Sequence, residues 1–344
     1  MSENVNRQWQ LQSSVDMRLS EEHFRWAESP VPSPGNGQVV VRNLWLSLDP
    51  TQLLQMLSVG EAPATPIGSV PTANALAQVV ESRLPGYAPG DLVEGFFGWE
   101  DYTVTDGTGF LPMAKVPSGT PPHLALGVYG ITGMVAYFGV LEVGRPRRGE
   151  TFVVSGAAGG VGYVAGQIAK IRGLRVIGIA GGRSKCTWLT RDLGFDAAID
   201  RHSEDVGARL TELCPDGIDI FFDNSGGPVL DLALSRLRQH GRVVLCGATA
   251  MYGAPNSSPG PSNYLSLVMV NGRMEGILAR DYADRYAEAR AALEGWIRSG
   301  QLITKEDVVV GLENAPRALA RLFSGENVGK QLLKIADPSP VRGS

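Results

Sequence analysis

The residues with the clearest chemical potential form a glycine-rich turn near the middle of the chain. An apolar run, Thr151-Phe152-Val153-Val154, leads into Ser155-Gly156-Ala157-Ala158-Gly159-Gly160-Val161-Gly162, and a segment with helical spacing follows. A buried strand, a tight turn and a helix start can place a pyrophosphate on free backbone N–H groups at the positive end of the helix. Gly159 and Gly160 would let the backbone approach phosphate, and Gly162 would let the helix pack closely on the strand. The context predicts a dinucleotide site rather than a plain strand–turn–helix.

The residues after the next predicted strand indicate which dinucleotide binds. In NAD-binding folds an acidic residue ends this strand and binds the ribose hydroxyls. Here Arg175–Ala180 is followed by Gly181-Gly182-Arg183-Ser184-Lys185, which has two cations and no carboxylate. A 2′-phosphate would accept charge-assisted hydrogen bonds from Arg183 or Lys185, and Arg201 adds a further cation. Cations are mildly unfavourable at the positive end of a helix, so their presence favours NADP(H) over NAD(H) and over ordinary solvated side chains.

Small residues end the fourth and fifth predicted strands, where ligands bind in a parallel α/β sheet. The fourth strand ends in Asp223-Asn224-Ser225-Gly226-Gly227 and the fifth in Cys246-Gly247-Ala248-Thr249. Such residues would let the nicotinamide half of the cofactor lie against backbone. In the alternative interpretation, Gly226-Gly227 is only a turn before a helix that Pro228 opens.

Metal and nucleophile chemistry are not expected. The four histidines are scattered, and none has a second His, Cys or Glu at ligand spacing. The chain has no Gly-x-Ser-x-Gly motif, no nucleophilic cysteine signature and no triad order. Hydride transfer by the cofactor then remains, with the protein supplying orientation and polarity.

The composition limits the class of protein. Of the 344 residues, 43% are hydrophobic and 19% are charged, which predicts a sizeable core. The net charge is −4 and no basic block is longer than Arg145-Pro146-Arg147-Arg148, which argues against nucleic acid as a partner. Three distant cysteines predict no disulfide framework and favour a cytoplasmic protein. The polar N-terminus is not that of a signal peptide.

One stretch requires a test for a membrane span, because Leu124–Leu141 contains no charged residue. It contains several glycines and leads directly into the predicted nucleotide strand. We therefore expect a buried helix that joins two domains, and no membrane association.

The remaining pattern predicts two domains. Short apolar runs between Pro and Gly turns are typical of an all-β unit; they are Gln38–Arg42, Leu76–Glu81, Asp91–Gly95, Asp101–Thr105 and Lys115–Pro117. Strands then alternate with helices, as in a doubly wound parallel sheet; the strands after the glycine turn are Arg175–Ala180, Ala197–Ile199, Ile218–Phe222, Arg242–Cys246 and Met274–Leu278. The helices are Ser184–Leu193, Glu204–Leu213, Val229–Leu237 and an amphipathic Asp281–Ser299 that covers the sheet. A mixed tail, with Val308–Val310, Ala315–Phe323 and Gln331–Ile335, is expected to return to the first domain.

Taken together, the motifs resemble the medium-chain dehydrogenase/reductase superfamily, in the zinc-free branch of prostaglandin reductases, leukotriene hydroxydehydrogenases, plant alkenal double-bond reductases and curcumin reductase. The segments that carry the resemblance are Leu46–Pro50, Val79–Ser82, Pro89–Asp91, Ala136–Gly139, the glycine turn with Gly166–Lys170, Leu193–Asp196, Cys214–Gly217, Phe222–Asn224, Arg273–Gly276 and Asn327–Lys330. The resemblance implies a GroES-like β domain (1–126 and 306–344) and a Rossmann NADP(H)-binding domain (127–305).

The resemblance also implies an activity. It is NADPH-dependent reduction of the carbon–carbon double bond of an α,β-unsaturated carbonyl compound, with hydride delivered to the β-carbon. Lys185 would bind the 2′-phosphate, and the other residues of the cofactor site would be Asn224, Cys246, Gly247, Ala248, Tyr252, Ile277, Leu278 and Asn327. Ala73-Asn74-Ala75 stands where zinc-dependent relatives carry Gly-His-Glu. Since relatives are often dimers through the edge of the Rossmann sheet, a homodimer is expected.

Departures from the family pattern concentrate on the expected substrate side. Many relatives follow Asp-Pro with Tyr-Met-Arg, whereas this chain has Asp49-Pro50-Thr51-Gln52-Leu53. Val135 replaces a threonine near the nicotinamide, and Arg201 replaces a tyrosine beside the 2′-phosphate. The candidates for the substrate pocket are Thr51, Tyr129, Val135 and Tyr264.

Tyr252 is the candidate catalytic residue. Its hydroxyl could stabilise a developing enolate or deliver the proton, although solvent could equally supply that proton. In the alternative interpretation, Tyr252 only packs over the cofactor. The Gly/Pro-rich loop from Met251 through Pro261 is expected to act as a lid.

The altered pocket leads us to expect a specialised, biosynthetic enone as the substrate. Two other functions stay open. One is quinone reduction with the same cofactor. The other is NADPH binding without turnover, as in a sensor or a partner-binding protein, because Thr51 and Leu53 stand where many relatives carry a tyrosine and an arginine.

Overall fold

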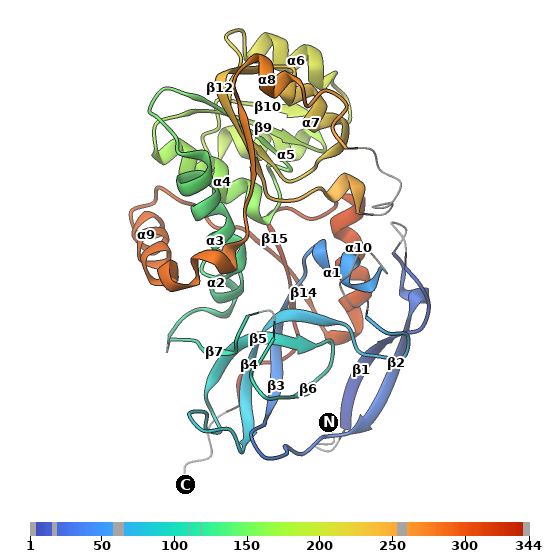
Figure 1. The fold of residues 1–344 in the computed structure, drawn as a ribbon. Coiled ribbons are helices and arrows are strands. Elements are labelled where there is room, and N and C mark those ends of the chain that lie inside the picture. Colours follow the sequence, from blue (N-terminus) through green and yellow to red (C-terminus); the bar gives the residue numbers. More distant parts are fainter. Residues whose placement is uncertain are drawn as a thin grey trace. The chain divides into compact units, whose positions relative to one another are not determined.

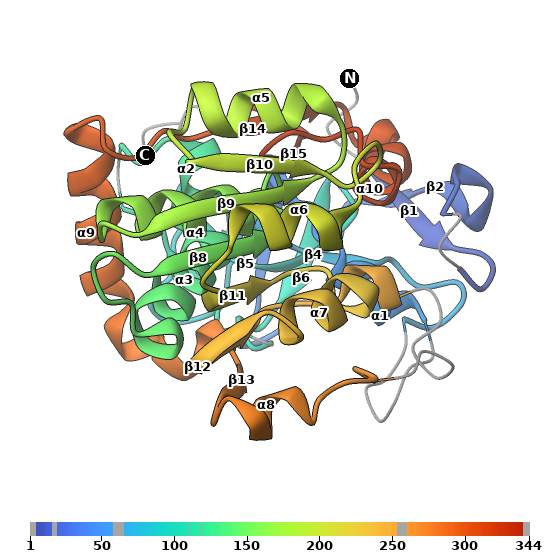
Figure 2. The same ribbon diagram turned by 90° about the horizontal axis from the view of Figure 1, so that it is seen from above.

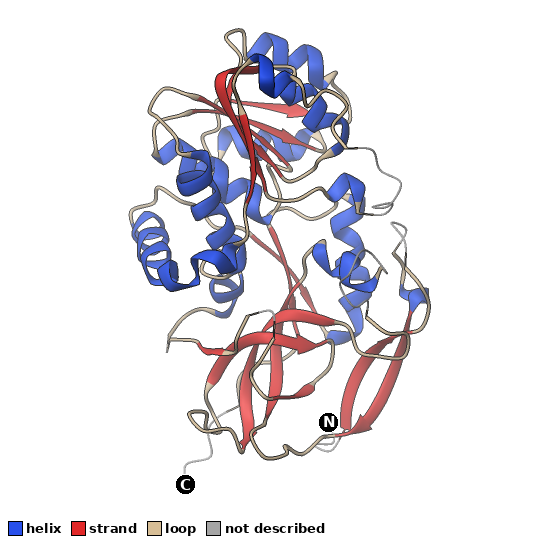
Figure 3. Ribbon diagram, viewed as in Figure 1, coloured by secondary structure: helices blue, strands red, loops and turns tan. Residues whose placement is uncertain are grey.

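The computed structural model describes residues 5–15, 19–57, 65–109, 111–117, 119–252 and 260–339. The chain forms two compact units. The first comprises Met1–Leu126, Glu306–Asn327 and Gln331–Ser344, and the second comprises Gly127–Lys305 with Val328–Lys330. Strands predominate in the first unit, whereas helices flank the sheet of the second (Figure 3).

The second unit is built on a six-stranded sheet in which every pair of neighbouring strands is parallel. Its strands are β8 (Thr151–Ser155), β9 (Arg175–Ala180), β10 (Ala197–Asp200), β11 (Ile218–Asp223), β12 (Leu237–Leu245) and β13 (Arg273–Gly276). They lie in the order β10-β9-β8-β11-β12-β13 (Figure 2). Counted along the chain, this is the 3-2-1-4-5-6 order of a Rossmann sheet. The predicted doubly wound sheet, with Met274 in its sixth strand, is confirmed.

Helices cover both faces of this sheet. The helices of the second unit are α3 (Ile131–Phe138), α4 (Gly160–Ile171), α5 (Arg183–Arg191), α6 (Val206–Leu213), α7 (Gly227–Leu234), α8 (Ser266–Met269) and α9 (Tyr286–Arg298), with a π-helical segment η2 (Gly139–Gly144) and the 3₁₀ segments η3 (Thr249–Met251) and η4 (Ala279–Arg285). Leu210 of α6 and Leu234 of α7 belong to one apolar cluster with Ile177 and Phe221 of the sheet. On the other face Leu189 of α5 packs against Gly178, where a Cβ would lie 2.9 Å from it. Apolar burial on both faces explains the near-continuous hydrophobic strands.

The predicted single helix over Leu124–Leu141 is wrong. The segment contains the end of α2 (Pro122–Leu126), a turn, then α3 and the π-helical η2. Gly133 permits the turn before α3, because a Cβ there would lie only 1.7 Å from the Val128 carbonyl oxygen. Within the described part of the chain, no helix combines the length and apolarity needed to cross a membrane.

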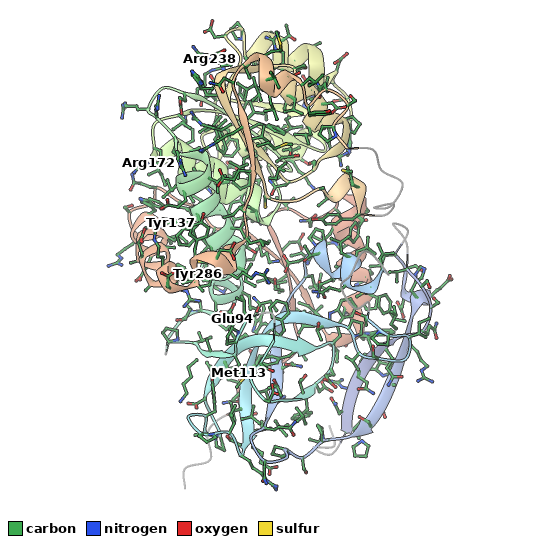
Figure 4. The ribbon with its side chains drawn as sticks, in the orientation of Figure 1. Glu94, Met113, Tyr137, Arg172, Arg238 and Tyr286 are labelled. Carbon is green, nitrogen blue, oxygen red and sulfur yellow. The ribbon has the colours of Figure 1, made fainter. Side chains whose placement is uncertain are left out.

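The predicted helix over Asp281–Ser299 also differs in detail. Its first part is η4, which is kinked at Tyr282 (φ −115°), and α9 begins only at Tyr286. The helix packs on α3, where the rings of Tyr137 and Trp296 are 6.0 Å apart and the Tyr137 hydroxyl donates to Glu288 Oε1 at 3.2 Å. Figure 4 labels Tyr137 and Tyr286 in this region. Likewise, α7 ends at Leu234, three residues before the predicted end, and Leu237 instead begins β12.

The first unit is built around an antiparallel sheet. Its strands are β1 (Val5–Leu11), β2 (Phe24–Pro30), β3 (Val39–Ser47), β4 (Thr72–Ser82), β5 (Leu92–Gly98), β6 (Tyr102–Thr105), β7 (Ala114–Lys115), β14 (Glu306–Val310) and β15 (Lys330–Lys334). Its helices and short turns are η1 (Glu21–His23), α1 (Thr51–Met56), α2, η5 (Leu312–Asn314) and α10 (Ala315–Ser324). The main sheet has the order β14-β15-β3-β4-β5-β7, with β6 also paired to β3. Strand β15, from the C-terminal part of the chain, therefore pairs with β3, from the N-terminal part. In Figure 1 β3 is blue and β15 is red.

A hairpin of β1 and β2 was not predicted from the sequence. Polar side chains attach it to the loop after β5: Arg7 forms a bidentate ion pair with Asp101 at 2.7 and 2.9 Å. The Asn6 amide donates to Glu100 Oε2 at 2.9 Å, and burial raises the pKa of Glu100 above that of an ordinary glutamate. These contacts are between residues more than 90 positions apart, which explains why local patterns did not indicate them.

Candidate functional site

The glycine turn between β8 and α4 depends on positions where a side chain would not fit. Gly156 has a φ of +58°, and its carbonyl oxygen accepts from the Gly159 N–H at 2.9 Å. A Cβ on Gly162 would lie 2.3 Å from that same oxygen and 2.9 Å from Ala157 Cα. The first turn of α4 can thus approach the end of β8 only with glycine at 162, as the sequence predicted for this position.

The N-terminus of α4 presents backbone N–H groups. Gly159 is the N-cap residue and has no side chain that could cap the first turn. The N–H groups of Gly160, Val161 and Gly162 begin the helix, and the first N–H groups of a helix have no intrahelical acceptor. Together with the positive end of the helix dipole, this turn offers a pyrophosphate several donors at once.

A strand segment from the C-terminal tail borders the turn. The Gly329 N–H donates to the Ala158 carbonyl at 2.8 Å, and Gly159 and Gly329 form a parallel β-bridge. Lys330, which is 2% exposed, places its Cδ 3.1 Å from where a Cβ on Gly160 would lie. The backbone of Ala158 and Gly159 is thus fixed by the tail as well as by the turn itself.

A buried aspartate connects the glycine turn to the end of β11. Asp223 is fully buried, and its carboxylate accepts from Ser155 Oγ at 2.7 Å and from the Gly226 N–H at 3.0 Å. Burial raises its pKa above that of an ordinary aspartate. The Asn224 amide donates to the Ser155 carbonyl at 2.7 Å. Asn224 is thereby held beside the glycine turn, although β8 and β11 are some seventy residues apart.

The end of β12 supplies a second backbone surface. The Tyr252 hydroxyl accepts from the Ala248 N–H at 3.4 Å, and a Cβ on Gly247 would lie 3.1 Å from that hydroxyl. Burial raises the pKa of Tyr252 above its usual range and the pKa of Cys246 to about 12, so both groups are protonated at neutral pH. The Tyr252 hydroxyl therefore lies directly against Gly247 and Ala248 at the end of β12.

The turn after β9 brings several cations to one place. Gly182 is the N-cap of α5 with a φ of +95°, and Arg183 is the first residue of that helix. Arg201 and His202 follow β10, the neighbouring strand, and both of their side chains lie close to Gly181. Lys185 lies in the first turn of α5. The three cations named from the sequence are therefore on two adjacent strand ends of one sheet.

The other predicted site residues are more dispersed. Ile277 is buried and bonded through its N–H to the Leu245 carbonyl at 3.0 Å, whereas Leu278 is half exposed. Tyr129 precedes α3, Val135 lies on it, and Tyr264 is 59% exposed just before α8. Thr51, exposed at the start of α1, and the buried Asn327 belong to the first unit. The expected lid through Pro261 lies largely at 253–259, outside the described residues.

The segment expected to correspond to the zinc ligands of zinc-dependent dehydrogenases, Ala73-Asn74-Ala75, has one polar side chain. Asn74 on β4 donates from its amide to Glu94 Oε1 on β5 at 3.0 Å, and Glu94 is labelled in Figure 4. Among the described residues, no group of three His, Cys, Asp or Glu side chains is placed to hold a metal ion.

Sequence analysis assigned no role to three residues of this region. Asp200 and Asp223 end β10 and β11 and hydrogen-bond to neighbouring turns, and His202 lies beside Gly181. The position of both aspartates at the carboxyl end of a predicted strand was the available signal. Nothing local distinguished His202 from an ordinary exposed histidine.

The comparisons with known proteins cover both units. Two family profiles match, one described as "N-terminal domain of oxidoreductase" over residues 7–113 and one as "Zinc-binding dehydrogenase" over residues 160–294. The chain is 39% identical to the NADPH-dependent curcumin reductase of Escherichia coli, over 96% of this chain and 97% of that protein. It is 38% identical to the 2-alkenal reductase (NADP(+)-dependent) of Nicotiana tabacum, over 88% of each.

A solved structure agrees with these matches. The crystal structure of CurA from Vibrio vulnificus in complex with NADPH has a TM-score of 0.90 and 36% identity, and the match covers 96% of this chain and 100% of that one. The same group of proteins is indicated by the Rossmann strand order, by the glycine turn and by sequence similarity over nearly the whole chain. The chain belongs to the medium-chain dehydrogenase/reductase superfamily, in the zinc-free branch of the curcumin and prostaglandin reductases.

Proposed function

We propose that this protein is an NADPH-dependent reductase that saturates the carbon–carbon double bond of α,β-unsaturated carbonyl compounds. The observation that carries the proposal is the near full-length similarity to reductases of this class, one of which is named for 2-alkenals. A 2-alkenal is itself an α,β-unsaturated carbonyl compound. The turns after β8 and β9 provide the backbone donors and cations that such a cofactor needs.

The described residues fit NADPH. The pyrophosphate would lie on the turn from Ala158 to Gly162, and Gly181, Gly182, Arg183, Lys185 and Arg201 would surround the 2′-phosphate. The rest of the cofactor would contact Asn224, Cys246, Gly247, Ala248, Tyr252, Ile277, Leu278 and Asn327. When bound, the cofactor supplies a hydride for the β-carbon of the substrate. The protein orients the two partners, and the α-carbon takes a proton from a side chain or from solvent.

Tyr252 is the proposed proton-donating or enolate-stabilising residue. Because burial raises its pKa, the phenol keeps its proton at neutral pH and can donate a hydrogen bond to a developing enolate. Tyr252→Phe should lower kcat by about tenfold or more while the Kd for NADPH changes little. An unchanged kcat would leave Tyr252 a packing role only and assign the proton to solvent.

The substrate is proposed to be a specialised, biosynthetic enone. Thr51, Tyr129, Val135 and Tyr264 are the proposed pocket residues, and two of them depart from the family pattern. Steady-state NADPH oxidation with a panel of enones tests this. Brisk turnover of short alkenals with none of larger cyclic enones would contradict it.

Product analysis separates this function from its alternatives. A saturated ketone or aldehyde identifies a double-bond reductase, whereas a hydroquinone identifies quinone reduction. NADPH binding in calorimetry without oxidation by any enone or quinone would instead favour a sensor or partner-binding protein.

We also propose a cytoplasmic homodimer formed through the second unit. Strand β13 ends the described sheet, and apolar side chains are exposed beside it: Leu265 is 63%, Val268 is 73% and Met269 is 80% exposed. An apolar patch next to an unpaired strand edge favours association. Sedimentation should give twice the chain mass, and Val268→Asp with Met269→Asp should give monomers. A monomeric wild type would contradict the proposal.

A further inference from the structure

We propose that His202 is an additional specificity-determining residue for the 2′-phosphate of NADPH, and that Asp200 is the positioning residue that holds it there. This inference rests on the proposed use of NADPH. It concerns a side chain on the turn after β10 and not the glycine turn, so it can be tested separately.

The position of the His202 ring is the first argument. A Cβ built on Gly181 would lie 2.8 Å from His202 Cε1, 3.0 Å from His202 Nε2 and 3.4 Å from Arg201 Nε. The imidazole and the guanidinium therefore both fold back over the backbone of Gly181. This is the turn after the second strand, where a Rossmann sheet distinguishes the two dinucleotides.

Asp200 ties this turn to the one after β10. Its Oδ1 accepts from the Gly182 N–H at 2.7 Å and from the His202 N–H at 3.0 Å. Its Oδ2 accepts from Ser203 Oγ at 2.8 Å, and the residue is only 7% exposed. One carboxylate thus fixes both the turn that carries Arg183 and the turn that carries His202.

The same hydrogen bonds leave Asp200 little capacity to accept from ribose hydroxyls. They lower its pKa, chiefly through the backbone N–H groups of His202 and Gly182, so that it stays ionised at neutral pH. Three protein donors already occupy most of the acceptor positions of its carboxylate. The acid therefore does not act as the ribose-binding carboxylate of an NAD-specific site; it orients the residues that would bind a phosphate.

The charged groups around His202 come from its own turn, from α5 and from α6. On its own turn are Arg201, Asp200 and Glu204, and Glu204 Oε2 accepts from the Asp200 N–H at 2.7 Å. Arg183 and Lys185 come from α5, and Arg209 of α6 pairs with Glu204 at 2.8 Å. A 2′-phosphate adds nearly two negative charges to this set. A ring N–H of His202 can donate a hydrogen bond to that anion, and a hydrogen bond to a charged acceptor is stronger than one between neutral groups.

The test is the affinity for NADPH relative to NADH, measured by calorimetry on the full-length chain. His202→Ala should weaken NADPH binding by about tenfold, the loss of one charge-assisted hydrogen bond, and leave NADH binding unchanged. His202→Lys should restore NADPH binding. Arg191→Ala, which removes an exposed cation from the far end of α5, is the matched control and should change neither affinity.

A double-mutant cycle tests the role of Asp200. Asp200→Asn should weaken NADPH binding more in the wild-type background than in the His202→Ala background, where only its effect on the turn that carries Arg183 remains. Additive losses would show that Asp200 does not act through His202. If His202→Ala weakens both dinucleotides equally, or neither, the specificity role is wrong. If wild type does not prefer NADPH, the proposed function itself fails.

Discussion

The turns after β8 and β9 would bind two parts of one cofactor by different means. The turn after β8 presents backbone: a Cβ at Gly162 would lie 2.3 Å from a carbonyl oxygen, and at Gly156 and Gly159 a Cβ would meet a neighbouring atom at 3.2 and 3.3 Å. The turn after β9 presents side chains, because Arg183 and Lys185 follow the N-cap Gly182, whose Cβ position meets nothing within 4 Å, and Arg201 lies close to Gly181. A pyrophosphate common to both dinucleotides suits the first turn, and a group that only one dinucleotide carries suits the second.

This difference predicts different responses to substitution. A backbone site is destroyed by small changes in volume, because the packing that shapes it cannot relax. A side-chain site loses affinity residue by residue while the fold persists. The predictions below follow from that contrast.

The largest effect is expected for Gly162→Ala. The new methyl group would overlap the Gly156 carbonyl oxygen, so unfolding should become easier by more than about 3 kcal/mol and dinucleotide binding should be lost. Gly295→Ala is the control, since this α9 glycine has open space around its Cβ position and alanine favours helices. Thermal melts of both variants check this; equal stability would show that the turn tolerates a side chain.

A smaller loss of stability, about 1–3 kcal/mol, is expected for Asp223→Asn. The amide has only one acceptor oxygen, so one N–H or O–H group that donates to the carboxylate, such as the Gly226 N–H, would face the amide N–H₂ and lose its acceptor. Burial raises the folded-state pKa of Asp223, so the folded protein binds its proton more tightly than the unfolded chain does. The contribution of this group to stability should therefore increase as the pH falls from the raised folded value toward about 3.9, the ordinary value for aspartate.

Melts of wild type and Asp223→Asn across that acidic range check the sign. The difference in melting temperature should widen as the pH falls. A difference that narrows would mean that the carboxylate is stabilised by its donors more than it is penalised by burial.

The smallest of the three effects is expected for Gly182→Ala. Nothing lies within 4 Å of its Cβ position, so no atoms clash, but its φ of +95° is unfavourable for alanine. The cost should be about 1–2 kcal/mol, with NADPH binding weakened and not abolished. Loss of all NADPH binding would mean that this turn, like the glycine turn, contacts the cofactor mainly through its backbone.

Local patterns predicted most of the second unit. The strands from β8 to β13 and the glycine turn each lie within about a dozen residues, so alternation of apolar runs with turn glycines was enough. The first unit was harder. The β1–β2 hairpin is bonded to residues near 100. Contacts between residues so far apart in the sequence cannot be detected from the pattern of a short segment. The Leu124–Leu141 helix failed because apolar composition does not reveal a turn forced by close backbone contact.

The candidate site divides in the same way. The glycines and Arg183 were predicted because they follow strand ends in the sequence. Asp200 and His202 were not, since their role depends on the pairing of β10 with β9, in which Asp200 lies opposite Ala180. That register brings two turns together, and single-sequence patterns do not give it.

The central claim, that side chains after β9 select NADPH, is tested most directly by titrating wild type and Arg183→Ala/Lys185→Ala with NADPH and NADH. The account predicts that wild type prefers NADPH, that the double variant binds it about 100-fold less tightly, and that NADH affinity is unchanged within about twofold. A wild type that prefers NADH, or a double variant that retains full NADPH affinity, would contradict it.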